Sequence, residues 1–237
     1  MHLPVLYHEV LHELSIKPDG IYIDCTFGRG GHSRGILEQL GPQGQLLALD
    51  RDLDAINSEY AQEMLQDERF SLEHVCFSQL AQVVERRGWQ GKVDGILMDF
   101  GVSSPQLDNA ERGFSFMQDG PLDMRMDVDN PNIRTAANIL EDISEEDLTC
   151  LIKDYGEEKY AYRIACNIIT RRCTKPVETT KDLEDIIFHS YPKKERYGKT
   201  NPATKTFQAI RIYINQEIDQ LEMFLNDSLD ILKIGGR

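Results

Sequence analysis

The sequence predicts an α/β protein, built on a doubly wound parallel sheet that an all-helical segment interrupts. In the first hundred residues, short apolar runs alternate with segments of helical length, which is the pattern of βαβ units and a parallel sheet. After the first hundred residues this alternation stops, and residues 135–190 show helical patterns only. A chain of 237 residues, of which 41% are hydrophobic, can form one sizeable core and an insertion.

Four strands are expected in the first hundred residues. Each is a short run of apolar, β-favouring residues next to a turn or a glycine. Segments between these runs predict helices, the first of which ends at Gly41-Pro42. The expected strands are 21–25, 46–50, 71–75 and 93–99, and the expected helices are 32–40, 53–66 and 78–87.

The second half of the chain is expected to hold one long loop followed by helices. Residues 101–134 are rich in Gly, Pro, Asp and Asn, and a loop of that length is usually functional or disordered. Helices are expected to start at Ser144 and to cover 157–172 and 180–190. Asn201-Pro202 predicts the start of a further long helix, with Asn as its cap and Pro in its first turn.

This last helix carries an apolar stripe with a spacing of three and four residues, which predicts one buried face. A break is expected near Asn226-Asp227-Ser228. The stripe consists of Phe207, Ile210, Ile214, Ile218, Leu221, Leu225, Leu229 and Leu232. The expected domains are a discontinuous first domain, 1–108 plus 203–237, and an inserted helical domain, 109–202. The Gly-Gly turn before Arg237 predicts a further strand, so we expect a piece of a longer chain.

Composition excludes several classes of protein. No run of about 18 apolar residues, which a membrane helix needs, occurs in the sequence. The N-terminus lacks the basic and apolar regions of a signal peptide. The five cysteines include no Cys-x-x-Cys pair, so neither a disulfide framework nor a zinc site is expected. We therefore expect a cytoplasmic protein with no membrane partner and no metal.

Charge is distributed unevenly along the chain. The net charge of −14 argues against general nucleic-acid binding. Residues 107–158 hold 14 acidic and 4 basic side chains, whereas residues 189–213 hold 6 basic side chains and Glu195 as the single acid. Charge runs are most often solvated faces, but the second stretch can also present a local basic surface to phosphate.

A glycine-rich loop, Asp24 to His32, follows the first expected strand. Glycines let a ligand approach the backbone, and the start of the next helix offers free N–H groups. Asp50, at the end of the second expected strand, can accept both hydroxyls of a ribose. These features fit a dinucleotide or S-adenosylmethionine. Ser33 stands where the dinucleotide pattern has its third glycine, and the acid at the start of the loop suits the cationic amino group of S-adenosylmethionine.

Asp99 ends the fourth expected strand and is followed by a loop that contains Ser104-Pro105-Gln106. Because the carboxyl ends of parallel strands meet at one edge of a sheet, Asp99 is expected beside Asp24 and Asp50. Enzymes that methylate exocyclic amino groups carry an Asp/Asn/Ser-Pro-Pro-aromatic tetrapeptide here, and Ser104-Pro105-Gln106 resembles a reduced form of it. This chemistry needs acceptors for N–H hydrogens and a flat slot for the base. Asp99, Ser104 and Pro105 are therefore candidate catalytic residues.

Several sequence blocks occur in order along almost the whole chain. The blocks are His2-x-Pro4-Val5-Leu6, Asp24-x-Thr26-Phe27-Gly28-Arg29-Gly30-Gly31-His32-Ser33, Asp50-Arg51-Asp52, Gly101-Val102-Ser103-Ser104-Pro105-Gln106-Leu107-Asp108, Arg112-Gly113-Phe114-Ser115-Phe116, Pro121-Leu122-Asp123-Met124-Arg125-Met126-Asp127, Tyr155-Gly156-Glu157-Glu158 and Pro202-Ala203-Thr204-Lys205-Thr206-Phe207-Gln208-Ala209. Through these blocks the sequence resembles the bacterial family that methylates N4 of a cytidine in small-subunit ribosomal RNA. The family pattern continues past the Gly-Gly-Arg with a further strand.

The resemblance implies a class I, Rossmann-like methyltransferase fold and S-adenosylmethionine as the cofactor. It implies small-subunit ribosomal RNA within a ribosomal particle as the substrate. The implied cofactor contacts are Gly30, Gly31, His32, Asp50, Phe77, Asp99 and Gln106. Phe77 also fits physically, because it follows the third expected strand, where an apolar residue would flank the adenine.

RNA contacts are expected in two places. Phosphate contacts are expected in the basic stretch, at Lys193, Lys194, Arg196 and Lys199. Arg112 and Phe114 are expected nearer the target base, where an aromatic ring can stack, although core packing of Phe114 is an equal alternative.

Two alternative interpretations stay open at this point. The protein could be a methyltransferase that acts on another RNA or on a protein, or an inactive fragment that binds the cofactor or RNA. The missing third glycine disfavours an NAD-dependent oxidoreductase. A cytosine-C5 enzyme needs a thiolate to attack the ring, and the loop after the fourth expected strand contains no Cys.

Overall fold

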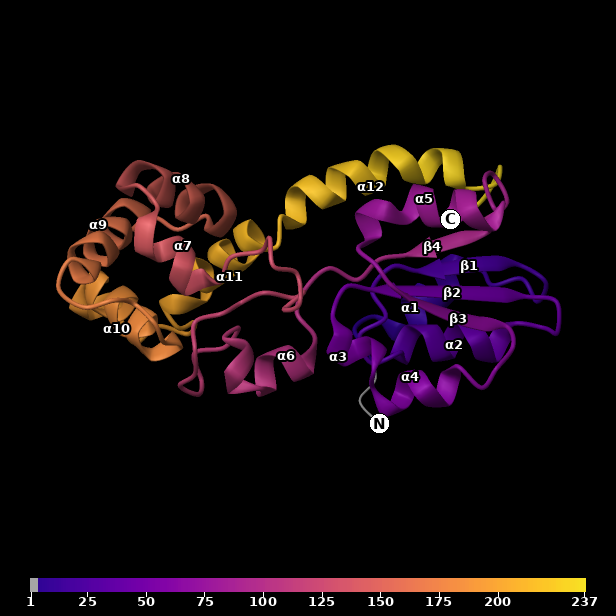
Figure 1. Cartoon of the computed structure of the whole chain (residues 1–237), viewed down its shortest axis with the longest axis horizontal. Coiled ribbons are helices and arrows are strands. Elements are labelled where there is room, and N and C mark those ends of the chain that lie inside the picture. Colours follow the sequence, from indigo (N-terminus) through magenta and orange to yellow (C-terminus); the bar gives the residue numbers. More distant parts are fainter. Residues whose placement is uncertain (1–3) are drawn as a thin grey trace. The chain divides into compact units, whose positions relative to one another are not determined.

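The computed structural model describes residues 4–237, which form two compact units with separate cores (Figure 1). The first unit is Met1–Gly101 with Ile218–Arg237, and the second is Val102–Glu217. His2 of the first sequence block lies outside the described residues. No helix within residues 4–237 has the length and apolar character that crossing a membrane requires.

A parallel sheet lies at the centre of the first unit. Within the described residues it has four strands in the order β3-β2-β1-β4. They are β1 (Ile21–Asp24), β2 (Gln45–Asp50), β3 (Phe70–His74) and β4 (Gly95–Leu97). This is the order of the first four strands of a doubly wound sheet, so the predicted fold class is confirmed. β4 is shorter than predicted because Val93 makes only an isolated bridge and the ladder ends at Leu97.

Helices cover both faces of this sheet (Figure 1). Successive strand residues point to opposite faces, so Leu46 and Ala48 of β2 join one core while Leu47 and Leu49 join the other. The first core includes side chains of α1 (Tyr7–Leu14), α2 (Gly31–Gln39) and α4 (Glu59–Met64). The second includes side chains of α5 (Leu80–Arg87) and α12 (Glu217–Ile231).

Helix capping explains why one of the predicted helices differs from the observed structure. The expected helix 53–66 is two helices, α3 (Leu53–Ile56) and α4, because Asp52 and Ser58 each accept a hydrogen bond from a backbone N–H of the following turn. The expected helix 78–87 begins with a 3₁₀ turn, η1 (Phe77–Gln79). Helix α1 was not among the predicted elements.

The second unit is a helical body, as predicted. Its core is formed by fully buried residues of successive helices, among them Leu148, Ile152, Ile164, Leu183 and Ile210. The helices are α7 (Ala136–Asp142), α8 (Glu145–Gly156), α9 (Ala161–Arg172), α10 (Thr180–Ser190) and α11 (Ala203–Ile214). α9 begins later than predicted, because α8 continues to Gly156 and the next residue, Glu157, has a left-handed conformation with φ of 48°.

Two sequence expectations differ from the structure around these helices. Residues 101–134 were predicted as one loop, but they contain α6 (Ser104–Asp108) and η2 (Ala110–Arg112). α11 was expected with residues 1–108, yet it packs against α8 within the second unit. Where the functional domains begin and end stays a prediction.

The predicted C-terminal helix breaks at Asn215-Gln216 and not near residues 226–228. The Asn215 side chain donates to the Met124 carbonyl over 2.8 Å and accepts from the Met126 N–H over 2.9 Å. Gln216 has a φ of 51°, in the left-handed region. α11 therefore ends where a buried amide binds a distant segment of the chain.

This break also changes which side of α12 is buried. Phe207, Ile210 and Ile214 of the predicted stripe are buried in the second unit. Beyond the break the stripe prediction is only partly confirmed: Leu221 and Leu232 pack against the second core, whereas Ile218, Leu225 and Leu229 are exposed. The buried apolar residues of α12 are Phe224 and Ile231, which the predicted stripe did not include.

Candidate functional site

The loop between β1 and α2 is closed by a buried carboxylate. Asp24, the last residue of β1, is 1% exposed. Its Oδ1 accepts from the Thr26 N–H over 3.1 Å, and its Oδ2 accepts from the Ser33 hydroxyl over 2.6 Å. Burial raises the pKa of Asp24, and both hydrogen bonds oppose the rise. Asp24 therefore holds both ends of the glycine-rich loop.

Gly30 and Gly31 give this loop a shape that side chains would not allow. Gly30 has a φ of 69°, and a Cβ atom there would come within 2.9 Å of the Phe27 ring. A Cβ at Gly31 would come within 2.9 Å of Pro4. The first N–H groups of α2 have no partner inside the helix, so this backbone offers donors to a polar or anionic group.

Asp50, the last residue of β2, contacts the same loop. Its Oδ2 accepts from the Gly28 N–H and its Oδ1 from the Asp52 N–H, both over 2.8 Å. Burial raises the pKa of Asp50 to about 6, against these two hydrogen bonds, and the negative charges of Asp52 and Asp24 add to the rise. Within residues 4–237 no basic side chain forms an ion pair with Asp50. The lone pairs that remain on its two oxygens fit the paired hydroxyls of a ribose.

Two aromatic residues follow β3 and β4. Phe77 is buried, and its ring lies edge-on to the rings of Phe100 and Phe224, with centroids 5.4 Å and 6.2 Å away. Phe100 is 43% exposed. Phe77 therefore supports, and Phe100 presents, apolar surface for a flat ring. Phe100 was missed in the sequence, although its position directly after Asp99 could have identified it.

Asp99 and His32 complete the predicted contacts in the first unit. The Asp99 N–H donates to the Thr26 hydroxyl over 2.8 Å, which ties the end of β4 to the loop, and its side chain is exposed. The buried His32 ring lies on Tyr7, and its Nε2 is 3.1 Å from the Val5 carbonyl oxygen. The His32 side chain thus packs on the N-terminal segment, and its backbone N–H is the group that can serve a ligand.

The structure brings Asp24, Asp50 and Asp99 to one edge of the sheet, at the carboxyl ends of β1, β2 and β4. Gln106 belongs to the second unit, where its Oε1 accepts from the Ser103 N–H over 2.9 Å at the start of α6. The cofactor contact of Gln106 and the catalytic roles of Ser104 and Pro105 stay predictions. Across residues 4–237, no group of three or more His, Cys, Asp or Glu side chains could hold a metal ion.

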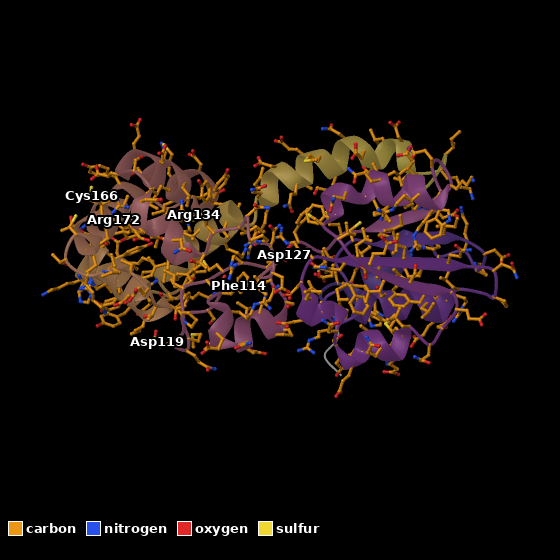
Figure 2. The ribbon with its side chains drawn as sticks, in the orientation of Figure 1. Phe114, Asp119, Asp127, Arg134, Cys166 and Arg172 are labelled. Carbon is orange, nitrogen blue, oxygen red and sulfur yellow. The ribbon has the colours of Figure 1, made fainter. Side chains whose placement is uncertain are left out.

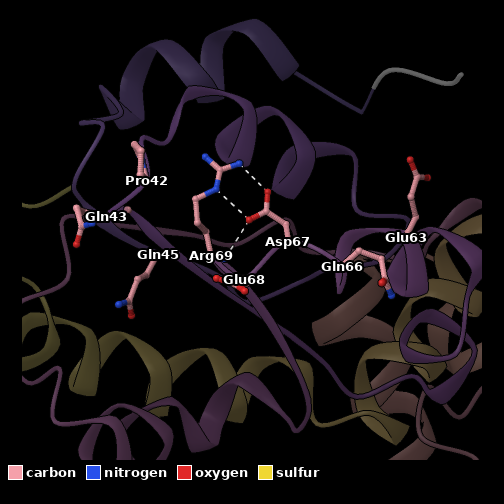
Figure 3. Close-up of a pocket in the computed structure, with 9 residues that line it drawn as sticks. Pro42, Gln43, Gln45, Glu63, Gln66, Asp67, Glu68 and Arg69 are labelled. Atoms are coloured by element: carbon pink, nitrogen blue, oxygen red, sulfur yellow. Dashed lines mark hydrogen bonds and ion pairs between the residues drawn. The ribbon is translucent and has the colours of Figure 1, made fainter.

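A shallow hollow of about 800 Å³ lies at the opposite ends of the strands (Figure 3). It is lined by residues around Gln45, which begins β2, and Arg69, which precedes β3. Arg69 is paired with Asp67, with Nη2 and Oδ2 2.6 Å apart. The hollow contains none of the predicted site residues.

Comparison with known proteins identifies the family of this chain. Residues 1–237 match the MraW methylase family. The chain belongs to this family. The Ribosomal RNA small subunit methyltransferase H of Methylococcus capsulatus is 54% identical over 229 residues, which are 97% of this chain and 75% of that relative. Two proteins of the same name, from Coxiella burnetii strains RSA 331 and CbuK_Q154, are 51% identical over 237 residues, or 100% of this chain and 75% of theirs. The family resemblance expected from the sequence is confirmed.

In this MraW methylase, the expected RNA contact of Arg112 and Phe114 needs correction. Phe114 is 6% exposed and belongs to the core of the second unit (Figure 2). Arg112 is also buried: its guanidinium lies 5.8 Å from the centroid of the Phe114 ring, and its Nη2 donates to the carbonyls of Arg125 and Met126. Both side chains are used in packing, so the core alternative is the correct one.

Several basic side chains of residues 189–213 already have partners within the fold, so fewer are available to phosphate than the sequence suggests. Lys205 donates to the Glu157 carbonyl over 2.9 Å, and Arg211 pairs with Glu217 over 2.8 Å. Arg196 donates to the carbonyls of Tyr191 and His189. Within residues 4–237, Lys193, Lys194 and Lys199 are the exposed basic side chains of this stretch that form neither an ion pair nor a hydrogen bond.

Proposed function

We propose that this protein transfers a methyl group from S-adenosylmethionine to the exocyclic N4 of a cytidine in small-subunit ribosomal RNA. The match of the whole sequence to the MraW methylase family carries the proposal. Relatives with 51–54% identity are named as small-subunit ribosomal RNA methyltransferases. The sheet order and the carboxylates at its edge support it.

The edge of the sheet fits this cofactor. Asp50 would accept the two ribose hydroxyls, and the N–H groups at Gly30, Gly31 and His32 would hold polar groups of the amino-acid end. Phe77 and Phe100 would flank the adenine. When bound, S-adenosylmethionine supplies an activated methyl group on a positively charged sulfur.

Asp99 is the proposed catalytic residue of the first unit. Its carboxylate is exposed at the end of β4, where it can accept an N–H hydrogen of the exocyclic amine and orient the nitrogen lone pair. Asp24 acts on the loop and keeps its backbone fixed. Because the methyl group arrives activated, positioning and exclusion of water supply most of the rate enhancement. Ser104 and Pro105 complete the proposed catalytic set.

We further propose that the RNA is bound within a ribosomal particle, in the cytoplasm. A protein with a net charge of −14 must concentrate its attraction for RNA in one place. Lys193, Lys194 and Lys199 are the exposed basic side chains that suit this role, because phosphate contacts need positive charge and carry little sequence information.

The test is to incubate the protein with labelled S-adenosylmethionine and unmodified small subunits, followed by nucleoside mass spectrometry with fragmentation. N4-methylcytidine is the expected product. Detection of C5-methylcytidine, or of label only in protein, would contradict the proposed reaction. A parallel reaction with naked ribosomal RNA tests the particle: equal labelling of naked RNA would contradict this part of the proposal.

A further inference from the structure

Tyr197 is the most exposed aromatic side chain of residues 4–237, at 86%. It lies in the loop between α10 and α11, where Arg196 separates it from η3 (Lys193–Glu195). An aromatic ring that folding leaves in water contributes little to the core, because its apolar area is not removed from solvent. The ring is therefore available to a partner.

A contact with α10 holds the Tyr197 ring in place. The ring lies edge-on to Phe188 of α10, with centroids 5.6 Å apart and planes at 77°. The guanidinium of Arg196 lies 5.2 Å from the centroid of the same Phe188 ring. Arg196 also donates to the carbonyls of Tyr191 and His189, so it fixes the loop to the end of α10. A ring ordered in this way loses less entropy on binding than a mobile one.

The negative charge in this loop is neutralised by contacts with the turn that precedes α9. Glu195 accepts from the Lys159 ammonium over 2.6 Å and from the Tyr160 hydroxyl over 2.9 Å. These partners lower the pKa of Glu195, so it stays ionised and paired. The basic side chains on either side of Tyr197 are then not opposed by the acid of their own loop.

We propose that Tyr197 stacks on a base of a single-stranded segment of the RNA substrate, while Lys193, Lys194 and Lys199 contact its phosphates. This inference rests on the proposed function. An exposed aromatic face between unpaired cations is the combination that single-stranded RNA needs, because every base has a face to stack and every linkage has a negative charge. Tyr197 thus takes the stacking role that the buried Phe114 cannot have.

The first experiment measures binding of the full chain to a fluorescein-labelled, unstructured 12-nucleotide RNA at several salt concentrations. Tyr197→Ala should weaken binding about five- to a hundredfold and leave the salt slope unchanged, because stacking is not ionic. Tyr197→Phe should bind like the parent, and Tyr197→Leu like the Ala variant. The triple variant Lys193→Gln, Lys194→Gln, Lys199→Gln should lower the log–log salt slope by about 2.

Tyr162→Ala is the matched control, because Tyr162 is a second tyrosine of the same unit, 65% exposed, on α9. It should leave RNA affinity unchanged, and no variant should change affinity for S-adenosylmethionine. Parent-like RNA binding by Tyr197→Ala, or no RNA binding by the parent, would overturn the inference. So would a Tyr197→Ala variant that loses binding to anionic lipid vesicles or an acidic peptide and keeps its RNA affinity.

Failure of the inference and failure of the proposed function give different results. RNA binding that depends on Tyr197, with no methylated nucleoside formed, would support the stacking role of Tyr197 and contradict the proposed reaction. If Tyr197→Ala forms N4-methylcytidine at the parent rate and binds RNA with unchanged affinity, the stacking role of Tyr197 is contradicted and the proposed reaction is supported.

Discussion

At the scale of single residues, Asp50 shows how folding can prepare a group for a ligand. Its pKa near 6 means that folding has raised the free energy of the ionised form. Because the pKa is higher in the fold than in the unfolded chain, the free energy of unfolding of the ligand-free protein falls as the pH rises from about 4 to about 6. Hydroxyl donors from a ribose would stabilise the same ionised form.

A pH dependence of cofactor affinity follows from this pKa. About one Asp50 in ten is ionised at pH 5 and about nine in ten at pH 7, so affinity for S-adenosylmethionine should rise about tenfold over this range. Calorimetric titrations at several pH values measure it. Asp50→Asn should bind roughly 10–150-fold more weakly at pH 7 and lose the pH dependence. A tenfold rise that persists in this variant would show that another group is responsible.

At the scale of elements, Asp94 joins the segment before β4 to two other segments of the first unit. The buried carboxylate accepts from the ammonium groups of Lys17, after α1, and Lys233, after α12, each over 2.9 Å, and from the Ile21 N–H over 3.2 Å. Burial acts to raise the pKa of Asp94, but the hydrogen bonds from the two lysines outweigh it and the pKa is lowered.

Asp94→Ala should therefore lower the free energy of unfolding by about 1–3 kcal/mol, a range that allows for the partly exposed lysines. The contribution of Asp94 is present at neutral pH and is lost as the pH falls below about 4, because its pKa in the fold is the lower one. Urea denaturation at pH 7 and pH 3 measures both effects. A loss of stability that is equal at the two pH values would contradict this account.

Gln216 gives a second prediction at this scale. Its φ of 51° is unfavourable for a residue with a Cβ, and its side chain is exposed. Gln216→Gly should raise the free energy of unfolding by about 0.5–1 kcal/mol. The same substitution at the exposed Gln62, inside α4, should lower it by about 1 kcal/mol. Chemical denaturation of both variants is the measurement, and destabilisation by Gln216→Gly would show that the side chain has an unrecognised role.

The strands, most helices and the edge where Asp24, Asp50 and Asp99 meet could be predicted, because they depend on local spacing and on the common direction of parallel strands. The break after α11 could not, since Asn215 binds Met124 and Met126, about 90 residues away in the sequence. Exposure of aromatic side chains also depends on distant packing. For that reason the sequence left RNA contact and core packing as equal alternatives for Phe114, and Phe100 and Tyr197 were missed.

At the scale of the whole molecule, two cores belong to two separate units, while the predicted cofactor contacts come from both. Hydrogen exchange with and without S-adenosylmethionine tests this. We expect slower exchange in residues 25–32 and in α6, where Gln106 lies, and unchanged exchange in α9 and α10. Unchanged exchange in α6 would remove Gln106 from the cofactor site, and slower exchange in α9 would show that the effect reaches the helical core.

The hydrogen bonds proposed for Asp50 involve a part of the cofactor that the reaction does not alter. Methyl transfer changes the charge on sulfur and leaves the ribose intact, so Asp50 would hold the demethylated product as firmly as S-adenosylmethionine. At higher pH both S-adenosylmethionine and the product would then bind more tightly. Because the product would inhibit more strongly, the rate of turnover would increase less than the affinity for S-adenosylmethionine. Preference for S-adenosylmethionine over the product would have to come from groups that sense the lost positive charge, and Asp24 and Asp99 are the other two carboxylates at the edge of the sheet where Asp50 lies.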